Sequence, residues 1–242
     1  ITTMSFEGEN DFGSLSLFEY KAKLPLLVNL LLTLQNLDPP EPVISRRFDT
    51  EKLSFEVNLT REKYRLFQSK FHIETELTQE MNAFLEETIA YLDQYPIQVF
   101  THRDFHCRNI LLHPTKEYSL IDFQDARLGI PQYDLASILY DAYYPLPRET
   151  RKDILNYFKS RSKDGSKRFT EAFYLQALQR SFKALGTYFR MVVDHQKMKF
   201  KPSILSCLNQ LEEIIQLGLF SDSLFIFVRS LRNELESHAE FK

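Results

Sequence analysis

The sequence is poor in cysteine and glycine and contains no tryptophan. Its 242 residues include only 2 cysteines, Cys107 and Cys207, which are distant in the chain. A disulfide-stabilised scaffold is therefore excluded, and the composition favours a reducing, cytoplasmic environment. The 6 glycines form no Gly-rich loop near the start of the chain, so a phosphate-cradling loop of that kind is missing.

The chain also lacks long apolar runs and a strong net charge. The leucine-rich stretch at residues 24–32 contains Asn29 and is too short to span a bilayer, so it predicts a buried helix. The net charge is −3, which argues against a general surface for nucleic acid or anionic membranes. We expect neither partner, and any attraction for phosphate must be local.

Apolar and aromatic residues, by contrast, are plentiful. Hydrophobic residues make up 43% of the chain, including 21 phenylalanines and 12 tyrosines, so we expect a globular protein with an aromatic-rich core. Helical spacing dominates, which predicts an α+β fold that is mainly α. Residues 39–42 predict an extended linker, and residues 160–167 predict a surface loop. The predicted helices span residues 21–37, 60–71, 78–95, 133–144, 148–161, 169–195, 202–219 and 221–237. Ser221 is predicted to cap the last of these helices.

The helix at residues 169–195 is the most regular. Its apolar side chains recur at three- and four-residue steps, which predicts one buried face, and Gln176 is predicted on another, polar face. Gly186 would let another backbone or a ligand approach that polar face.

The most informative segment is the sequence His-Arg-Asp-Phe-His-Cys-Arg-Asn at residues 102–109. An apolar, β-favouring stretch precedes it at residues 99–101. After it, residues 110–112 and 118–121 predict short strands joined by a turn. Such a hairpin returns Asp122 to the neighbourhood of Asn109.

Oxygen-bearing side chains in this region suit phosphoryl transfer. That reaction needs an acceptor hydroxyl held in line and cations that neutralise charge on the transferred group. Asp104 can accept the hydroxyl proton, while Asn109 and Asp122 offer the hard oxygen ligands that Mg²⁺ prefers. The region therefore predicts a phosphotransferase site.

Together with residues 121–126, 133–137 and 178–186, this segment resembles the aminoglycoside phosphotransferase and choline kinase superfamily, small-molecule relatives of protein kinases. Within it, the narrower likeness is to bacterial kinases that phosphorylate the anomeric hydroxyl of N-acetylmuramate and N-acetylglucosamine. The resemblance implies a protein-kinase-like carboxy-terminal lobe with a short β-hairpin at the catalytic loop. It also implies an enzyme that uses ATP and Mg²⁺.

The same resemblance assigns roles to individual residues. Asp104 is the catalytic base, and Asn109 and Asp122 hold the metal ions. Asp134 accepts backbone N–H bonds from the loop, and His102 packs and hydrogen-bonds within it. Both of these last two residues support the loop and do not touch the substrate.

Other side chains have two interpretations each. His106 contacts the acceptor or a phosphate, or it fills the loop. Arg180 and Lys183 face either solvent or the acceptor pocket, and the resemblance favours the pocket. Asp125 supports a metal-bound water or is a turn residue, whereas Arg108 is solvated or pairs with a carboxylate.

His102, His106 and Cys107 are also residue types that bind zinc. No second Cys or His pair lies at finger or ribbon spacing from them. We therefore expect no zinc-thiolate site in this loop.

Enzymes of this superfamily also have an amino-terminal lobe, which covers the nucleotide and supplies a lysine for its phosphates. No strand-borne lysine precedes the catalytic loop at the expected distance. Residues 1–20 are predicted as a hinge-like remnant of a missing amino-terminal lobe, and residues 21–242 as the carboxy-terminal lobe that binds the acceptor. We expect this chain alone to bind nucleotide weakly and to be inactive.

The leading prediction is an ATP-dependent kinase that acts on a hydroxyl of an amino sugar of the N-acetylmuramate/N-acetylglucosamine type. An aminoglycoside antibiotic phosphotransferase is an alternative, although a polycationic acceptor favours an acidic pocket and not the basic Arg180 and Lys183. A non-catalytic pseudokinase is an alternative from another class. The set of Asp104, Asn109 and Asp122 argues against it, whereas the missing lobe argues for it.

Overall fold

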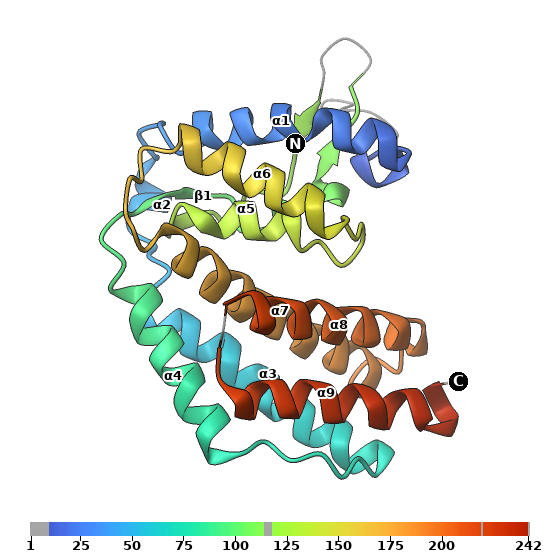
Figure 1. Cartoon of the computed structure of the whole chain (residues 1–242). Coiled ribbons are helices and arrows are strands. Elements are labelled where there is room, and N and C mark those ends of the chain that lie inside the picture. The colour runs from blue at the N-terminus through green and yellow to red at the C-terminus, as the bar shows by residue number, and fades with distance from the viewer. Residues whose placement is uncertain (1–9, 114–117, 219, 242) are drawn as a thin grey trace, which may run out of the picture. The chain divides into compact units, whose positions relative to one another are not determined.

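The computed structural model describes residues 10–113, 118–218 and 220–241 (Figure 1). The chain folds as two compact units, each built from two stretches of sequence. The first combines the described residues up to Arg47 with Ile97–Phe169, and the second combines Phe48–Pro96 with the described residues from Thr170 onward. Within the described ranges, no helix combines the length and the apolar character needed to cross a membrane.

The helices of the first unit include the predicted buried one. Helix α1 starts with a capping box, in which Ser16 Oγ accepts the Glu19 N–H and the Glu19 carboxylate accepts the Ser16 N–H at 3.0 Å. Its leucines are buried as predicted, with Leu24, Leu27 and Leu31 at most 1% exposed. The helices of this unit are α1 (Leu17–Leu34), α2 (Glu41–Ile44), α5 (Gln132–Leu139) and α6 (Arg148–Arg161).

The described strands form antiparallel pairs in the first unit. Strand β1 (Val99–Thr101) pairs with β4 (Arg127–Gly129), and β2 (Ile110–Leu111) pairs with β3 (Ser119–Leu120). The β2–β3 hairpin confirms the short hairpin predicted after residue 109, although residues 114–117 of its turn lie outside the described residues. The β1–β4 pairing was not predicted, because residues 127–129 lack a run of β-favouring side chains.

The segment before α1 is attached to the β2–β3 hairpin. The Leu112 N–H donates to the Asn10 carbonyl at 2.8 Å, and Asp11 forms an isolated bridge with Leu111. Phe12 follows in a short 3-10 turn (Phe12–Ser14) and is fully buried. These residues belong to the predicted hinge, whose residues 1–9 lie outside the described residues.

The second unit has an aromatic core, as the composition predicts. The Phe189 ring lies 4.6 Å from the Phe67 ring and 5.4 Å from the Tyr64 ring, and Tyr64 also packs edge-on against Phe227 at 5.3 Å. The helices of this unit are α3 (Thr50–Phe71), α4 (Gln79–Asp93), α8 (Lys201–Gly218), α9 (Asp222–Ser237) and, from Thr170 onward, α7 (Phe169–Val193).

Helix α7 has the predicted apolar face and one unexpected feature. Gln176 was predicted on the polar face, but it is 1% exposed and donates to Gln179 Oε1 at 2.9 Å. The prediction for Gln176 was wrong because its side-chain nitrogen finds a buried acceptor, Gln179 Oε1. The residues of the apolar face are all buried: Leu175, Leu178, Phe182, Leu185, Phe189 and Val192.

Gly186 allows α3 to approach α7 closely. Thr60 Oγ1 donates to the Phe182 carbonyl at 3.2 Å, and a Cβ atom at Gly186 would lie only 2.8 Å from the Thr60 Cα. The absence of a side chain at Gly186 therefore permits contact with another backbone, one of the two possibilities that the sequence leaves open.

Some predicted boundaries were wrong, each for a local reason. Helix α3 begins at Thr50 and not at residue 60, because Asp49 caps it by accepting the Lys52 N–H at 3.0 Å. Residues 39–42 were predicted as an extended linker, but α2 begins at Glu41, since Pro42 is compatible with a first helical turn.

Two later boundaries also differ from the prediction. Helix α5 ends at Leu139 and not at residue 144, because Tyr140 adopts a non-helical φ of −115° and ψ of 39°. Residues 160–167 are not wholly a surface loop. Arg161 is still in α6, and Asp164 is 2% exposed because it accepts the Ser166 N–H at 3.0 Å.

Candidate active site

Asp134 on α5 fixes the beginning of the loop at residues 102–109. Its carboxylate is buried and accepts the backbone N–H of His102 at 2.7 Å and that of Arg103 at 2.9 Å. Hydrogen bonds to an ionised acceptor are stronger than neutral ones. Strand β1 leads into the loop at this point, so Asp134 anchors the backbone directly before Asp104.

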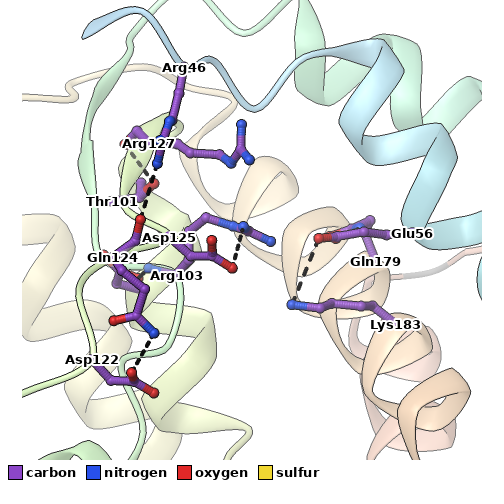
Figure 2. Close-up of polar contacts among 11 residues, drawn as sticks. Arg46, Glu56, Thr101, Arg103, Asp122, Gln124, Asp125, Arg127, Gln179 and Lys183 are labelled. Carbon is purple, nitrogen blue, oxygen red and sulfur yellow. Dashed lines mark hydrogen bonds and ion pairs between the residues drawn. The ribbon is translucent and has the colours of Figure 1, made fainter. Parts of the chain in front are cut away.

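Left-handed backbone occurs at Asp122 and at Arg103, which directly precedes Asp104. Arg103 has a φ of 74° and Asp122 a φ of 72°, which costs a non-glycine residue free energy. At Arg103 the conformation is maintained by the Asp134 bond and by an ion pair at 3.6 Å with Asp125 (Figure 2). Strain that is held by surrounding bonds is frequent at active sites.

Asp104 and Asn109 are joined across the loop. The Asn109 side-chain amide donates to the backbone carbonyl of Asp104 at 2.9 Å, and the His106 N–H donates to the same carbonyl at 3.1 Å. Asn109 is buried, whereas Asp104 is half-buried. Because the Asn109 nitrogen is directed to the loop backbone, Oδ1 is the atom suited to a metal ion.

The β2–β3 hairpin returns Asp122 to this loop. The Ile121 N–H donates to the Asn109 carbonyl at 3.0 Å, so Asp122 directly follows a residue bonded to Asn109. The Asp122 side chain is exposed and accepts a hydrogen bond from Gln124 at 2.5 Å (Figure 2). Arg46 in turn donates to the Gln124 carbonyl at 3.1 Å, which fixes the turn after Asp122.

The electrostatics of His102 show that two carboxylates act on one buried ring. Burial lowers the pKa of His102, and the negative charges of Asp104 and Asp122 oppose this shift. The ring also packs edge-on against Phe105, with centroids 6.2 Å apart. His102 is therefore neutral near pH 7 and lies within electrostatic reach of both Asp104 and Asp122.

His106 and Arg108 have different partners. The His106 ring packs edge-on against Tyr143 at 5.4 Å, and its Nε2 lies 3.4 Å from the side-chain nitrogen of Asn109. Arg108 is exposed and donates to the Asp11 carboxylate at 3.0 Å. Arg108 thus pairs with a carboxylate, whereas the half-buried His106 packs against Tyr143.

A family model described as "Phosphotransferase enzyme family" matches residues 2–169. The chain belongs to this family. The match covers the catalytic-type loop, the β2–β3 hairpin and Asp134, and it confirms the superfamily that the sequence motifs indicate.

Two curated relatives within this family are sugar kinases. The chain is 29% identical over 177 residues to the N-acetylmuramate/N-acetylglucosamine kinase of Neisseria meningitidis serogroup B (strain ATCC BAA-335 / MC58). This alignment covers 69% of the chain and 52% of that protein. It is 28% identical over 107 residues to the enzyme of the same name from Caulobacter vibrioides (strain ATCC 19089 / CIP 103742 / CB 15), covering 42% and 30%. The chain thus spans about half the length of the first relative and less than a third of the second.

Solved structures of phosphotransferases share the fold. The gentamicin complex of APH(2'')-IIa matches with a TM-score of 0.51 at 18% identity, over 91% of this chain and 71% of that one. A thermostable mutant of aminoglycoside phosphotransferase APH(4)-Ia in its apo form matches with a TM-score of 0.52 at 15% identity, over 89% and 72%. These matches confirm a mainly helical fold that resembles the carboxy-terminal lobe of a kinase.

A divalent metal ion fits the chemistry of Asn109 and Asp122. Both present oxygen atoms, and Mg²⁺ is usually held by one or two carboxylates together with water and substrate phosphates. In the described part of the chain, no group of three or more His, Cys, Asp or Glu side chains is placed to hold a metal ion. Asn109 and Asp122 thus present oxygen atoms of the kind that Mg²⁺ prefers.

Arg180 and Lys183 lie on α7, in the second unit. Lys183 Nζ is 3.8 Å from the Glu56 carboxylate, which also accepts a hydrogen bond from Gln179 at 3.1 Å (Figure 2). Glu56 is 4% exposed, whereas Lys183 is half-buried.

Arg180 is close enough to the buried Cys207 to affect its titration. Burial raises the pKa of Cys207 to about 12, and the nearby charge of Arg180 opposes that rise.

Besides Asp164, sequence reasoning missed the buried carboxylates of Glu56 and Asp141. Glu56 fell before the predicted start of its helix, and Asp141 fell inside a helix that in fact ends at Leu139. The sequence does contain a signal for such residues. An acidic residue inside an apolar stretch predicts a buried carboxylate with a hydrogen-bond or charge partner. The residues around Asp141 form such a stretch, Ile138-Leu139-Tyr140-Asp141-Ala142-Tyr143.

Proposed function

We propose that this chain is the acceptor-binding and catalytic part of an ATP-dependent phosphotransferase that phosphorylates a hydroxyl of an amino sugar of the N-acetylmuramate/N-acetylglucosamine type. The observation that carries the proposal is the hydrogen-bonded loop that joins Asp104 to Asn109 and Asp122. The sugar class is supported by the curated relatives, which are named as kinases of these sugars.

Asp104 acts as the base in this proposal. As the acceptor oxygen attacks the terminal phosphorus of ATP, its proton passes to the Asp104 carboxylate, and the bond to the leaving ADP breaks. Proton transfer by a positioned side chain contributes about 10²–10⁴-fold to the rate. Half-burial suits this role, because the carboxylate is reachable by a substrate yet anchored through its backbone carbonyl.

Asn109 and Asp122 hold the metal ion in this proposal. A bound Mg²⁺ would neutralise charge on the nucleotide phosphates. Asn109 offers Oδ1 from a side chain whose nitrogen is bonded to the loop, so the oxygen is preoriented. Asp122 is exposed and its second oxygen can turn towards an ion while Gln124 holds the first.

His102 and Asp134 keep the loop in place without taking part in the chemistry. Asp134 holds the amides that precede Asp104. The lowered pKa of His102 keeps its ring neutral, so it does not form an ion pair that would compete for Asp104 or Asp122. Both residues therefore act through the position of the loop.

His106, Arg180 and Lys183 are proposed contacts of the acceptor. His106 follows the base closely in the loop, and its ring nitrogen already lies near the Asn109 amide. Arg180 and Lys183 bring positive charge to α7, which suits the carboxylate of N-acetylmuramate better than a polycationic antibiotic. The ion pair with Glu56 orients the Lys183 side chain.

Because the chain spans about half the length of the first curated relative, we propose the activity for the protein that joins it to a nucleotide-covering lobe. We propose residues 1–20 as the hinge to that lobe and residues 21–242 as the acceptor-binding lobe. Without the other lobe, the chain should bind nucleotide weakly and turn over negligibly.

The test is a screen of the complete protein for acceptor-dependent ADP release with ATP and Mg²⁺. The acceptors are N-acetylmuramate, N-acetylglucosamine, gentamicin and kanamycin, and the variants are Asp104→Asn and, as a matched control, Asp153→Asn on the exposed face of α6. We expect release with an amino sugar, lost in Asp104→Asn and kept in Asp153→Asn. ADP release with the aminoglycosides but with neither amino sugar would show that the acceptor is an aminoglycoside. If Asp104→Asn were about as active as the parent, Asp104 would not be the catalytic base.

A further inference from the structure

Asp141, two residues after the end of α5, is a buried carboxylate that contacts the second half of the loop at residues 102–109. It is 2% exposed, and its two oxygens accept the Cys107 N–H and the Tyr143 N–H, each at 2.8 Å. An unpaired carboxylate at this depth would be strongly unfavourable, and these two hydrogen bonds help to stabilise it.

The Cys107 side chain is fully buried at this point of the loop. The bond from its backbone N–H, at 2.8 Å, ties the loop to Asp141.

The groups held by Asp141 are close to the proposed chemistry. Cys107 is the first residue of the 3-10 turn Cys107–Asn109, and Asn109 at its end binds the Asp104 carbonyl. Tyr143, the second residue that Asp141 binds, packs its ring against His106 at 5.4 Å. Asp141 thus holds both the residue that follows His106 and the residue whose ring packs against it.

We propose that Asp141 is a positioning residue for phosphoryl transfer, which sets the orientation of His106 and Asn109 by holding Cys107 and Tyr143. Asp134 fixes the part of the loop before Asp104, and Asp141 fixes the part after it. The inference rests on the proposed function, because positioning matters only if Asp104 and Asn109 act on a substrate.

Asp164 provides a matched control in the same unit. It is also 2% exposed, and it accepts hydrogen bonds from Gln132 at 2.9 Å and from the Ser166 N–H at 3.0 Å. Its partners lie on α5 and in the turn after α6, not in the loop at residues 102–109. Losing one bond at either carboxylate should destabilise the fold to a similar extent, but only Asp141 should affect the reaction.

The experiment compares Asp141→Asn and Asp164→Asn in the complete protein. An asparagine keeps one acceptor oxygen, so one of the two N–H bonds is lost without a change of shape. We expect Asp141→Asn to lower kcat by about 10–100-fold with the KM for ATP changed less than about threefold, because a misplaced loop impairs the reacting geometry. Asp164→Asn should lower Tm similarly and keep kcat within about twofold of the parent.

A second readout does not depend on turnover. Amide hydrogen exchange of residues 105–109 should be faster in Asp141→Asn than in the parent and unchanged in Asp164→Asn. Unchanged exchange in Asp141→Asn, or an equal loss of kcat in both variants, would overturn the positioning role. If the parent phosphorylates none of the acceptors, the proposed function fails, and the exchange measurement still decides whether Asp141 orders the loop.

Discussion

The loop of the first unit and helix α7 of the second hold their backbones by different means. The loop at residues 102–109 has little regular structure, and buried carboxylates at Asp134 and Asp141 accept its amides. Helix α7 satisfies its own amides and is held by a continuous apolar face and by the close contact at Gly186. Directional bonds position the loop, whereas shape and apolar area position the helix.

This difference separates the consequences of mutation. A loop that depends on a few charge-assisted bonds loses its geometry when one acceptor is removed, so activity and stability fall together. A helix packed along a face distributes its stabilisation, so a single change lowers stability and leaves the chemistry of the folded fraction intact. The following experiments test this contrast.

Removing Asp134 should have the largest effect. Asp134→Ala deletes the acceptor of two buried amides, and since a hydrogen bond to a charged group is worth about 1.5–3 kcal/mol, the free energy of unfolding should fall by about 3–6 kcal/mol. Asp134→Asn keeps one acceptor oxygen and should lose about half as much. Urea unfolding followed by circular dichroism measures both variants.

The control for Asp134 is Asp153→Ala on α6, where the carboxylate is exposed. Its free energy of unfolding should stay within about 0.5 kcal/mol of the parent. Equal losses in Asp134→Ala and Asp153→Ala would show that the loop does not depend on its buried anchor, and the contrast between loop and helix would be lost.

The same contrast explains what the sequence could predict. The apolar face of α7, the β2–β3 hairpin and α6 follow from local periodicity and turn signals, and all three were predicted. The partners of Glu56 and Asp141 depend on residues distant in the chain, which no local pattern encodes. Which residues of the loop carry the chemistry stays a prediction from the motif, whereas the folded backbone shows how the loop is held.

Gly186→Ala should reduce stability without impairing catalysis. The added Cβ would lie 2.8 Å from the Thr60 Cα, closer than packed carbons come, so the free energy of unfolding should fall by about 1–3 kcal/mol. Activity per folded molecule of the complete protein should remain. The measurements are urea unfolding and kcat corrected for the folded fraction.

Gly165 offers the matched glycine for this test. A Cβ there would meet nothing within 4 Å, so Gly165→Ala should leave stability unchanged or raise it by about 0.4–1 kcal/mol. If Gly186→Ala were as harmless as Gly165→Ala, α3 and α7 would tolerate separation and the packing argument for the helix would be wrong.

The buried ring of His102 should make the loop sensitive to acid. Its pKa is lowered in the folded chain, so the unfolded chain binds more protons, and the free energy of unfolding falls as the pH drops below about 6.5. The slope from this residue is at most about 1.4 kcal/mol per pH unit. Chemical unfolding between pH 7 and pH 5 should give a shallower slope for His102→Gln, and identical slopes would contradict a neutral buried ring.

Helix caps in the second unit should have the smallest effect, since apolar faces hold its helices. Thr78 caps α4 by accepting the Met81 N–H at 3.1 Å, so Thr78→Ala should cost about 1 kcal/mol. Ser221 was predicted to cap α9, but the described structure gives it no side-chain cap bond, and its hydroxyl pairs with Ser223 at 2.7 Å. Ser221→Ala should therefore change urea unfolding by less than about 0.5 kcal/mol. A larger loss at Ser221 than at Thr78 would mean that α9 depends on polar anchoring as the loop does.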